Sequence, residues 1–145
     1  MCIRDSELFK KKLGVVGLGK IGTHVAKVAN ALGMDVYGYD PFVSSERAQQ
    51  LQVKLSELQT LFAESDYVTL HLPRTSETEN LVDMKVLKSM KNNAKLINCA
   101  RGGIIDEEAL AEALNNSLIG GAAIDVFAKE PLDSNSPLLL SLIHI

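Results

Sequence analysis

The sequence of 145 residues contains no tryptophan, and aromatic residues make up only 5% of it. Its two cysteines, Cys2 and Cys99, are too few for a disulfide framework, which fits a reducing compartment such as the cytoplasm. No apolar run approaches the roughly 18 residues of a membrane span. The net charge of −3 lacks the basic excess of nucleic-acid-binding domains. We therefore expect one cytoplasmic globular domain with no nucleic-acid or membrane partner and no metal site.

The most informative segment is rich in glycine: Gly17-Leu18-Gly19-Lys20-Ile21-Gly22. An apolar run over residues 13–16 precedes it and predicts a buried strand. Apolar residues at helical spacing follow it and predict a helix, which Gly33 is suited to end. These apolar residues are Ile21, Val25, Val28 and Leu32. A second predicted strand, over residues 34–39, ends at Asp40.

This order of strand, glycines, helix and a strand ending in an acid predicts a dinucleotide site. Gly17 permits a tight turn, Gly19 lets a pyrophosphate approach the backbone, and Gly22 lets the helix pack closely on the strand. Free N–H groups at the start of the helix would face the phosphates. Asp40 would accept hydrogen bonds from both ribose hydroxyls of NAD and would repel the extra phosphate of NADP. The predicted cofactor is NAD.

Strands and helices alternate along the rest of the chain. Further strands are expected over residues 53–55, 67–72, 95–98 and 121–126, and further helices over residues 44–51, 56–63, 83–90 and 107–115. Ser56-Glu57-Leu58-Gln59 has the pattern of a capping box, and Asp83 and Asp106 are suited to cap their helices. About six strands connected in this way predict an α/β fold with a doubly wound parallel sheet of the Rossmann type, covered by helices on both faces.

The ligand crevice of such a sheet lies beyond the carboxyl ends of its strands. We expect four places in the sequence to line it, because each follows a predicted strand: Asp40, His71–Pro73, Cys99–Arg101 and Asp125.

Two further segments narrow the interpretation, residues 98–107 and residues 123–131. Together with His71-Leu72-Pro73 and the glycines, they resemble the D-isomer-specific 2-hydroxyacid dehydrogenases, over nearly all of residues 13–138. The resemblance implies an NAD-dependent oxidoreductase that transfers a hydride between NAD and a D-2-hydroxy acid. Within the family, the segments are most similar to members that act on 3-phosphoglycerate in serine biosynthesis. The resemblance also implies a homo-oligomer whose NAD-binding domain is inserted in a substrate domain.

The roles of individual residues follow from the same resemblance. Arg101 matches the arginine that clamps the substrate carboxylate, a task suited to its planar fork. Glu130 matches the carboxylate that pairs with the catalytic histidine and raises its pKa. Contacts with the cofactor are implied for Lys20 and Ile21 through their backbone, for Asp125 with the nicotinamide amide, and for Leu72, Pro73, Cys99, Ala100 and Arg101 along the adenine and nicotinamide sides.

The family places its catalytic histidine after the Glu130-Pro131 motif, in a Pro-His-x-Gly setting that this sequence does not contain. His144 lacks that setting, His24 is expected at the surface, and His71 is expected to position other groups rather than to catalyse. Cys99 is expected to be a small packing residue and not a nucleophile. We therefore expect the chain alone to lack turnover.

Both ends of the chain are expected to be foreign. Residues 1–6 and 140–145 both fit translation of one short DNA sequence, read from its two strands, which resembles a transposase adapter used to prepare sequencing libraries. Segments of this kind are left out of reasoning about the fold. We expect native protein over residues 7–139 only, a partial NAD-binding domain truncated at its C-terminal end.

A second interpretation stays open. An NADH-sensing transcriptional corepressor of the same family would keep the cofactor site but bind protein partners. Turnover of a 2-hydroxy acid, as opposed to binding of a peptide motif without turnover, would separate the two.

Overall fold

The structure is a computed structural model that describes residues 7–131 and 136–140. Of the expected foreign ends, 1–6 and 140–145, only Leu140 is described, and Cys2 and His144 lie outside the described residues. The strands are β1 (Lys12–Val16), β2 (Asp35–Tyr39), β3 (Lys54–Leu55), β4 (Tyr67–Leu70), β5 (Lys95–Asn98) and β6 (Gly121–Ile124). The helices are α1 (Lys20–Ala31), α2 (Ser45–Gln50), α3 (Leu58–Glu64), α4 (Met84–Ser89), α5 (Glu107–Asn115) and the short 3₁₀ helix η1 (Pro137–Leu140).

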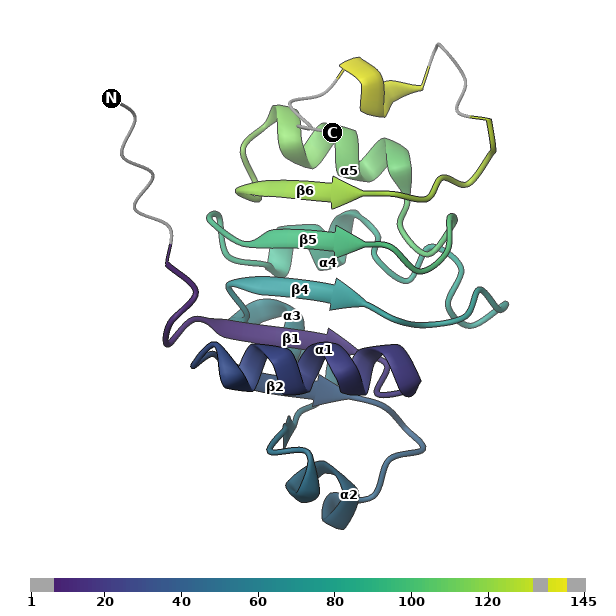
Figure 1. The fold of residues 1–145 in the computed structure, drawn as a ribbon. Coiled ribbons are helices and arrows are strands. Elements are labelled where there is room, and N and C mark those ends of the chain that lie inside the picture. The colour runs from purple at the N-terminus through teal and green to yellow at the C-terminus, as the bar shows by residue number, and fades with distance from the viewer. Residues whose placement is uncertain (1–6, 132–135, 141–145) are drawn as a thin grey trace.

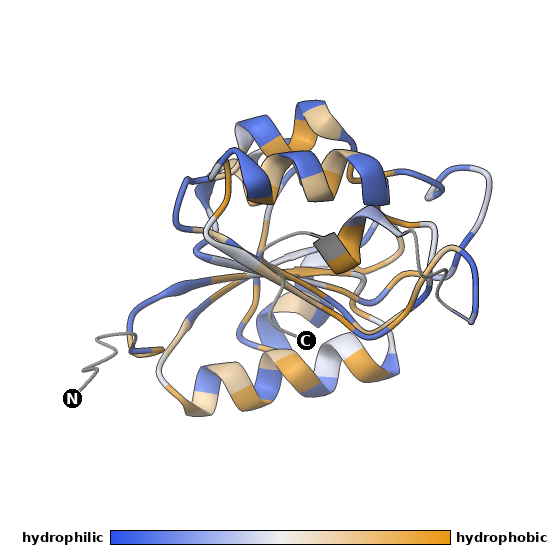
Figure 2. Cartoon of the chain, turned by 90° about the horizontal axis from the view of Figure 1, so that it is seen from above, coloured by the Kyte–Doolittle hydropathy of each residue, from blue (hydrophilic) through white to orange (hydrophobic). Residues whose placement is uncertain are grey.

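All the strands run parallel in one sheet of order β3-β2-β1-β4-β5-β6. The chain builds the sheet outward from β1 to β3, then crosses back to β4 and continues to β6. Helix α1 lies in front of the sheet and α3, α4 and α5 lie behind it (Figure 1), and Figure 2 shows the sheet edge-on between these layers. The predicted α/β fold with a parallel Rossmann-type sheet is confirmed.

The helices cover the two faces of the sheet less evenly than expected. In the part of the chain that the structure describes, α1 packs on β1 and β2, and no helix lies over β5 and β6 on that face. Ala123 of β6 is accordingly exposed. The expected cover of helices on both faces therefore holds for the half of the sheet around β1 and not for its β6 edge. Within the described ranges, no helix is long and apolar enough to cross a bilayer.

Two separate apolar clusters hold the layers together, one on each face of the sheet. Strand β1 contributes to both, because successive side chains of a strand point to opposite faces. Val15 packs into the cluster under α1, and Val16 into the cluster under α3 and α4; each is 0% exposed. The segment that follows Val16 therefore leaves the sheet from its most buried strand.

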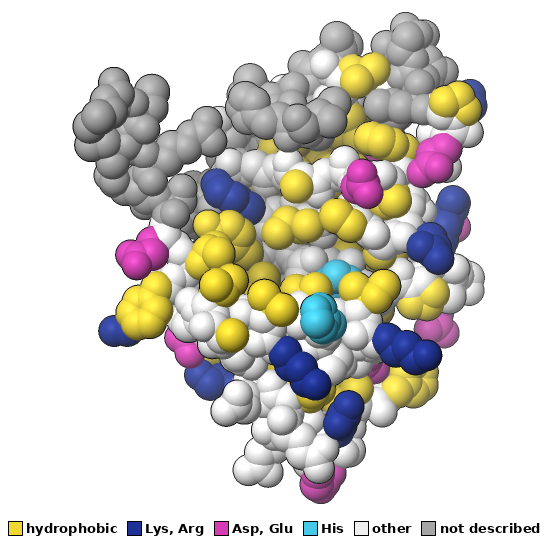
Figure 3. All heavy atoms as spheres, viewed as in Figure 1, with side chains coloured by type: hydrophobic (Ala, Val, Ile, Leu, Met, Phe, Trp, Pro, Cys, Tyr) yellow, Lys and Arg dark blue, Asp and Glu magenta, His cyan; other side chains and the backbone are white. Residues whose placement is uncertain are grey.

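The predicted helix after the glycines is confirmed as α1, but its buried side is not the one marked by the apolar period. Ile21, Val28 and Leu32 are 69%, 48% and 52% exposed. The residues that α1 buries are Gly22, Ala26 and Ala29. Small side chains let this helix lie close to the sheet, and of the predicted apolar residues only Val25 packs against the core, where it is partly buried. Figure 3 shows apolar side chains gathered on this face of the molecule.

The expected caps are partly confirmed. Asp83 accepts a hydrogen bond from the N–H of Val86 over 2.8 Å, and Asp106 accepts from the N–H groups of Glu108 and Ala109 over 3.1 Å each. The capping box at Ser56 is wrong, because its hydroxyl donates to the carbonyl of Glu57 and α3 begins one residue later without a side-chain cap. Strands β4 and β6 each end two residues earlier than predicted.

Candidate functional site

The turn between β1 and α1 has a shape that only glycine fits. Gly17 has a φ of 95°, and a Cβ added there would lie 2.6 Å from the carbonyl oxygen of His71. A Cβ at Gly22 would collide with the carbonyl oxygen of Gly17, which is backbone and cannot move aside cheaply. The predicted roles of these two glycines, a tight turn and close helix packing, match this geometry.

Gly19 differs from its two neighbours in the motif. A Cβ built there would meet no atom within 4 Å, so the space in front of it is open. The backbone N–H groups of Lys20, Ile21 and Gly22 donate no hydrogen bond within the described part of the chain. The first turn of α1 has neither an acidic residue nor a side-chain cap. An opening bordered by free N–H groups at a helix start is suited to a phosphate.

Asp40 lies at the end of β2, beside the glycine loop. One carboxylate oxygen accepts a hydrogen bond from the N–H of Leu18 over 2.8 Å, and the other accepts from the N–H of Phe42 over 2.9 Å. Each oxygen keeps a further lone pair. The side chain borders a cavity of about 380 Å³, whose lining also includes Gly38, Tyr39, Pro41, Leu55, Ser56 and Glu57.

A second cavity, of about 330 Å³, opens over the start of α1 and the ends of β4 and β5. Its lining combines three segments that are far apart in the sequence: Gly19–Gly22, His71–Pro73 and Cys99–Arg101. Nearly all of the predicted cofactor-binding residues therefore meet in one place. Gly17 lies beneath them, Asp40 lies in the neighbouring cavity, and Asp125 and Glu130 line neither cavity.

His71 belongs to the floor of this second cavity. Its backbone N–H donates to the carbonyl of Val16 over 2.7 Å and so continues the hydrogen bonding between β1 and β4. Its Nε2 lies 3.0 Å from the hydroxyl oxygen of the buried Thr69. Burial lowers the pKa of His71, which favours the uncharged imidazole. This arrangement fits the positioning role expected for His71.

Cys99, expected to be a small packing residue in the crevice, is exposed and lines the second cavity. It follows β5 at the point where the chain turns out of the sheet, between the buried Asn98 and the partly buried Ala100. The next residue, Arg101, is also exposed, and its guanidinium donates to the carbonyl of Ala100 over 2.7 Å. The guanidinium forms no ion pair among the described residues.

The loops that follow β5 and β6 pack against each other. A Cβ at Gly102 would collide with the carbonyl of Phe127, and the N–H of Ala128 donates to the carboxylate of Glu107 over 2.6 Å. The exposed Glu130 accepts a bond from the N–H of Phe127 over 3.3 Å. Arg101 and Glu130 are therefore carried by two loops in contact.

Sequence reasoning missed Ser56 and Glu57, which line the cavity beside Asp40. The signal was present, because both residues directly follow a predicted strand, where the ligand crevice of a parallel sheet lies. Their pattern was interpreted as a helix cap instead.

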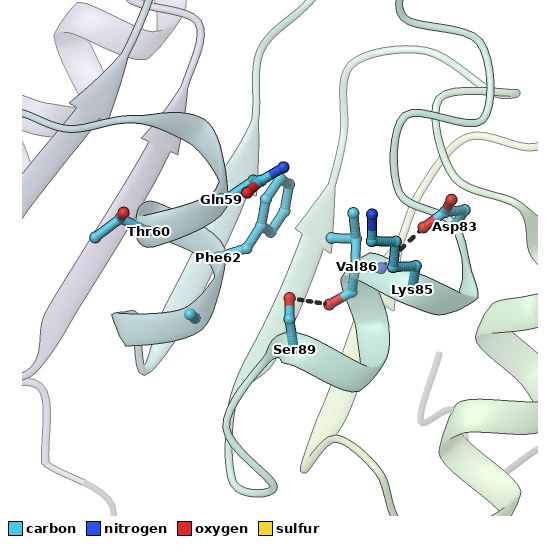
Figure 4. Close-up of a pocket in the computed structure, with 8 residues that line it drawn as sticks. Gln59, Thr60, Phe62, Asp83, Lys85, Val86 and Ser89 are labelled. Carbon is cyan, nitrogen blue, oxygen red and sulfur yellow. Dashed lines mark hydrogen bonds between the residues drawn. The ribbon is translucent and has the colours of Figure 1, made fainter.

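A third cavity, of about 510 Å³, lies between α3 and α4 (Figure 4). Phe62 and Gln59 of α3 border it on one side, and Val86 of α4 on the other. Two of its polar side chains already bond within α4: Asp83 caps the helix, and Ser89 donates to the carbonyl of Val86 over 2.7 Å. It is a gap between two surface helices, and it contains none of the predicted site residues.

Comparison with known proteins agrees with the geometry. Residues 2–143 match the family model of the D-isomer specific 2-hydroxyacid dehydrogenase, NAD binding domain. The chain belongs to this family. It is 59% identical over 127 residues to the D-3-phosphoglycerate dehydrogenase of Synechocystis sp., and 50% identical over 133 residues to that of Archaeoglobus fulgidus. These alignments cover 88% and 92% of this chain but only 23% and 25% of the relatives, so the chain spans about a quarter of their length.

The fold of this NAD-binding domain also matches solved structures. D-Lactate dehydrogenase with NAD⁺ from Lactobacillus jensenii superimposes with a TM-score of 0.82 at 34% identity, covering 90% of this chain and 41% of that one. The predicted cofactor, NAD, is thus confirmed for the family, and the open space at Gly19 with its free N–H groups fits it.

Proposed function

We propose that this domain serves an NAD-dependent dehydrogenase that oxidises a D-2-hydroxy acid, with 3-phosphoglycerate as its substrate. The observation that carries the proposal is the second cavity, in which a group that recognises carboxylates, Arg101, lies alongside the phosphate-binding start of α1. The names of the relatives, D-3-phosphoglycerate dehydrogenases, support the choice of substrate. The place of the reaction in serine biosynthesis follows from that substrate.

The domain's own residues divide into two groups in this proposal. Residues that hold the cofactor are Gly17, Gly19, Lys20, Ile21, Gly22, Asp40, Leu72, Pro73, Cys99, Ala100, Arg101 and Asp125. NAD, when bound, supplies the acceptor for the hydride that leaves C2 of the hydroxy acid. Backbone N–H groups at the start of α1 neutralise charge on the pyrophosphate, and Asp40 accepts from the ribose.

Arg101 and Glu130 act on the substrate side. The exposed guanidinium of Arg101 binds the substrate carboxylate through two parallel N–H donors and draws electron density from the C2 oxygen. Glu130 orients the histidine that takes the proton of the substrate hydroxyl. The carboxylate of Glu130 also raises the pKa of this histidine, as a carboxylate beside an imidazole does. Their contacting loops support a shared role.

We also propose that the full-length protein is a cytoplasmic homo-oligomer that binds no nucleic acid. The exposed thiol of Cys99 is compatible with a reducing compartment. Exposed apolar side chains lie on and just after α1: Ile21, Val28 and Leu32. Exposed apolar surface of this kind is typical of contacts between subunits. No observation favours the corepressor alternative, and the relatives named above are dehydrogenases.

The test is turnover by a full-length enzyme that carries this domain. NADH formation is followed by absorbance with 3-phosphoglycerate, D-glycerate and D-lactate as alternative substrates. We expect the highest kcat/KM with 3-phosphoglycerate and with NAD rather than NADP. Equal or higher kcat/KM with D-lactate would contradict the substrate, and absence of turnover with all three would contradict the activity.

A further inference from the structure

Asn98, the last residue of β5, makes an unusual set of contacts for a buried polar side chain. It is 2% exposed. Its carboxamide nitrogen donates to the carbonyl of Arg101 over 3.0 Å, and its carboxamide oxygen accepts from the N–H of Ala100 over 3.1 Å. Its backbone carbonyl accepts from the N–H of Asp125 over 3.0 Å. One residue therefore holds the backbone of three proposed site residues.

The chemistry of these contacts requires an amide. A side chain at this position must donate to one backbone group and accept from another, and asparagine has both functions on one planar group. An aspartate has the same shape but would turn an oxygen toward the carbonyl of Arg101. An alanine would leave the N–H of Ala100 and the carbonyl of Arg101 without their partner.

The position of the turn matters because its outer side borders the cofactor cavity. Cys99, Ala100 and Arg101 all line that cavity. Between the strand and the glycines that follow, the carboxamide of Asn98 is the side chain that ties the turn back to the sheet. A change in the turn would shift both the wall of the cavity and the Cα position from which the Arg101 side chain extends.

We infer that Asn98 is a positioning residue: its carboxamide fixes the turn that presents Ala100 and Arg101 to the cofactor cavity. The consequence for the substrate carboxylate rests on the proposed function, whereas the consequence for NAD binding does not. Asn98 itself does not line the cavity, because it is buried beneath the turn.

The experiment compares Asn98→Asp and Asn98→Ala with the matched control Leu96→Val, in the 145-residue chain. Leu96 is 0% exposed, lies on the same strand and shares the face of Asn98, so its shortening weakens the core without touching the turn. Three quantities are measured for each protein: the melting temperature, the Kd for NAD by calorimetry, and hydrogen exchange of the Ala100 amide by NMR.

We expect both Asn98 variants to raise the Kd for NAD about ten-fold, as loss of a satisfied buried hydrogen bond does. Leu96→Val should lower the melting temperature while changing the Kd less than about two-fold. Exchange at Ala100 should accelerate in Asn98→Ala but stay slow in Asn98→Asp, which keeps the accepting oxygen.

One result would overturn the inference. In it, the Asn98 variants have a lowered melting temperature, as Leu96→Val does, but keep both the NAD affinity and the slow Ala100 amide exchange of the unaltered chain. None of the three measurements depends on turnover. Failure of the dehydrogenase activity in a full-length enzyme is therefore distinguishable from failure of the positioning role. In that enzyme at saturating NAD, Asn98→Asp combined with Arg101→Lys should lose no more kcat/KM for the hydroxy acid than Arg101→Lys alone, because the effect of Asn98 on the substrate acts through the guanidinium.

Discussion

The carboxylate of Asp40 accepts a hydrogen bond from the backbone N–H of Leu18 over 2.8 Å, which joins the end of β2 to the glycine loop after β1. A second bond, from the N–H of Phe42, fixes the other oxygen. The acid proposed to meet the ribose is therefore held in place by the backbone before any ligand arrives, so binding does not have to order it.

Replacing Asp40 by Ala should raise the Kd for NAD about ten-fold, because a charge-assisted hydrogen bond and the anchor of the loop are lost together. The Kd for NADP should change less, since the repulsion of its extra phosphate disappears. Calorimetric titration with both dinucleotides measures the two effects. Asp35→Ala is the control, because Asp35 begins the same strand but is exposed and pairs only with Lys54 over 3.4 Å. An unchanged ratio of the two Kd values in Asp40→Ala would contradict the assignment.

Gly19 and Gly22 should respond differently to the same change. Gly19→Ala places a methyl group in open space, so the melting temperature should hold while the Kd for NAD rises, since the pyrophosphate can no longer approach. Gly22→Ala drives a methyl group into the carbonyl of Gly17, so both the melting temperature and the affinity should fall. Thermal unfolding and calorimetry of the two variants check this. Similar melting temperatures for both would show that the loop geometry is wrong.

Arg101→Lys in a full-length enzyme should lower kcat/KM for the hydroxy acid by roughly 10²-fold, because a point charge cannot replace the planar fork. The Kd for NAD should change far less, since the backbone of the turn is intact. Arg47→Lys is a suitable control, because Arg47 is exposed on α2 away from both cavities. Wild-type kinetics in Arg101→Lys would remove Arg101 from the substrate site.

Glu130→Gln in the same enzyme should move the pH profile rather than abolish activity. A neutral amide no longer stabilises a protonated histidine, so the pKa of the catalytic base should fall and the limb of kcat/KM that it governs should shift to lower pH. Steady-state kinetics across the pH range measure this shift. A profile that keeps its position while only its height drops would point to a purely structural role for Glu130.

Asp66 should make folding stability depend on pH. Burial alone would raise its pKa, but hydrogen bonds from the ammonium of Lys91 over 2.8 Å and the N–H of Lys12 over 2.9 Å outweigh burial and lower the pKa. A carboxylate with a lowered pKa stabilises the fold fully above its ordinary pKa of about 4, and this stabilisation is lost as the pH falls through the lower folded value.

Asp66→Asn should therefore lower the free energy of unfolding by about 1–3 kcal/mol at neutral pH. Denaturant unfolding should show this difference shrinking as the pH falls below about 4. Asp35→Asn, which breaks only an exposed pair, should cost less than about 1 kcal/mol. A constant difference for Asp66→Asn across the whole pH range would contradict the role of the charge.

Most of the element order could be predicted from the sequence, because local signals and the global fold agree. Asp106 illustrates this agreement: its side chain caps α5 at the expected residue, and the helix spans Glu107–Asn115, as predicted. The exposed apolar side of α1 could not be predicted. Close packing through Gly22, Ala26 and Ala29 depends on how near the helix lies to the sheet, and periodicity alone does not report that distance.

The sequence predicted where the candidate site lies better than it predicted which side chains point into the protein there. Residues that follow parallel strands meet at one edge of the sheet, which is why Gly19, His71 and Arg101 line one cavity. Which side chain at a strand end points inward depends on the turn that follows. Asn98 therefore lies inside and Cys99 outside, although the sequence favoured a packing role for the cysteine.

The two apolar clusters that share β1 have a consequence for local opening of the molecule. Val15 and Val16 belong to different clusters, so freeing the amides of β1 requires both to separate, whereas β6 contacts one cluster and ends the sheet. Hydrogen exchange should accordingly be slowest in β1 and faster toward β6. The phosphate loop would then be attached to the last part of the fold to open, while the loop that carries Glu130 can fluctuate without unfolding the cofactor site.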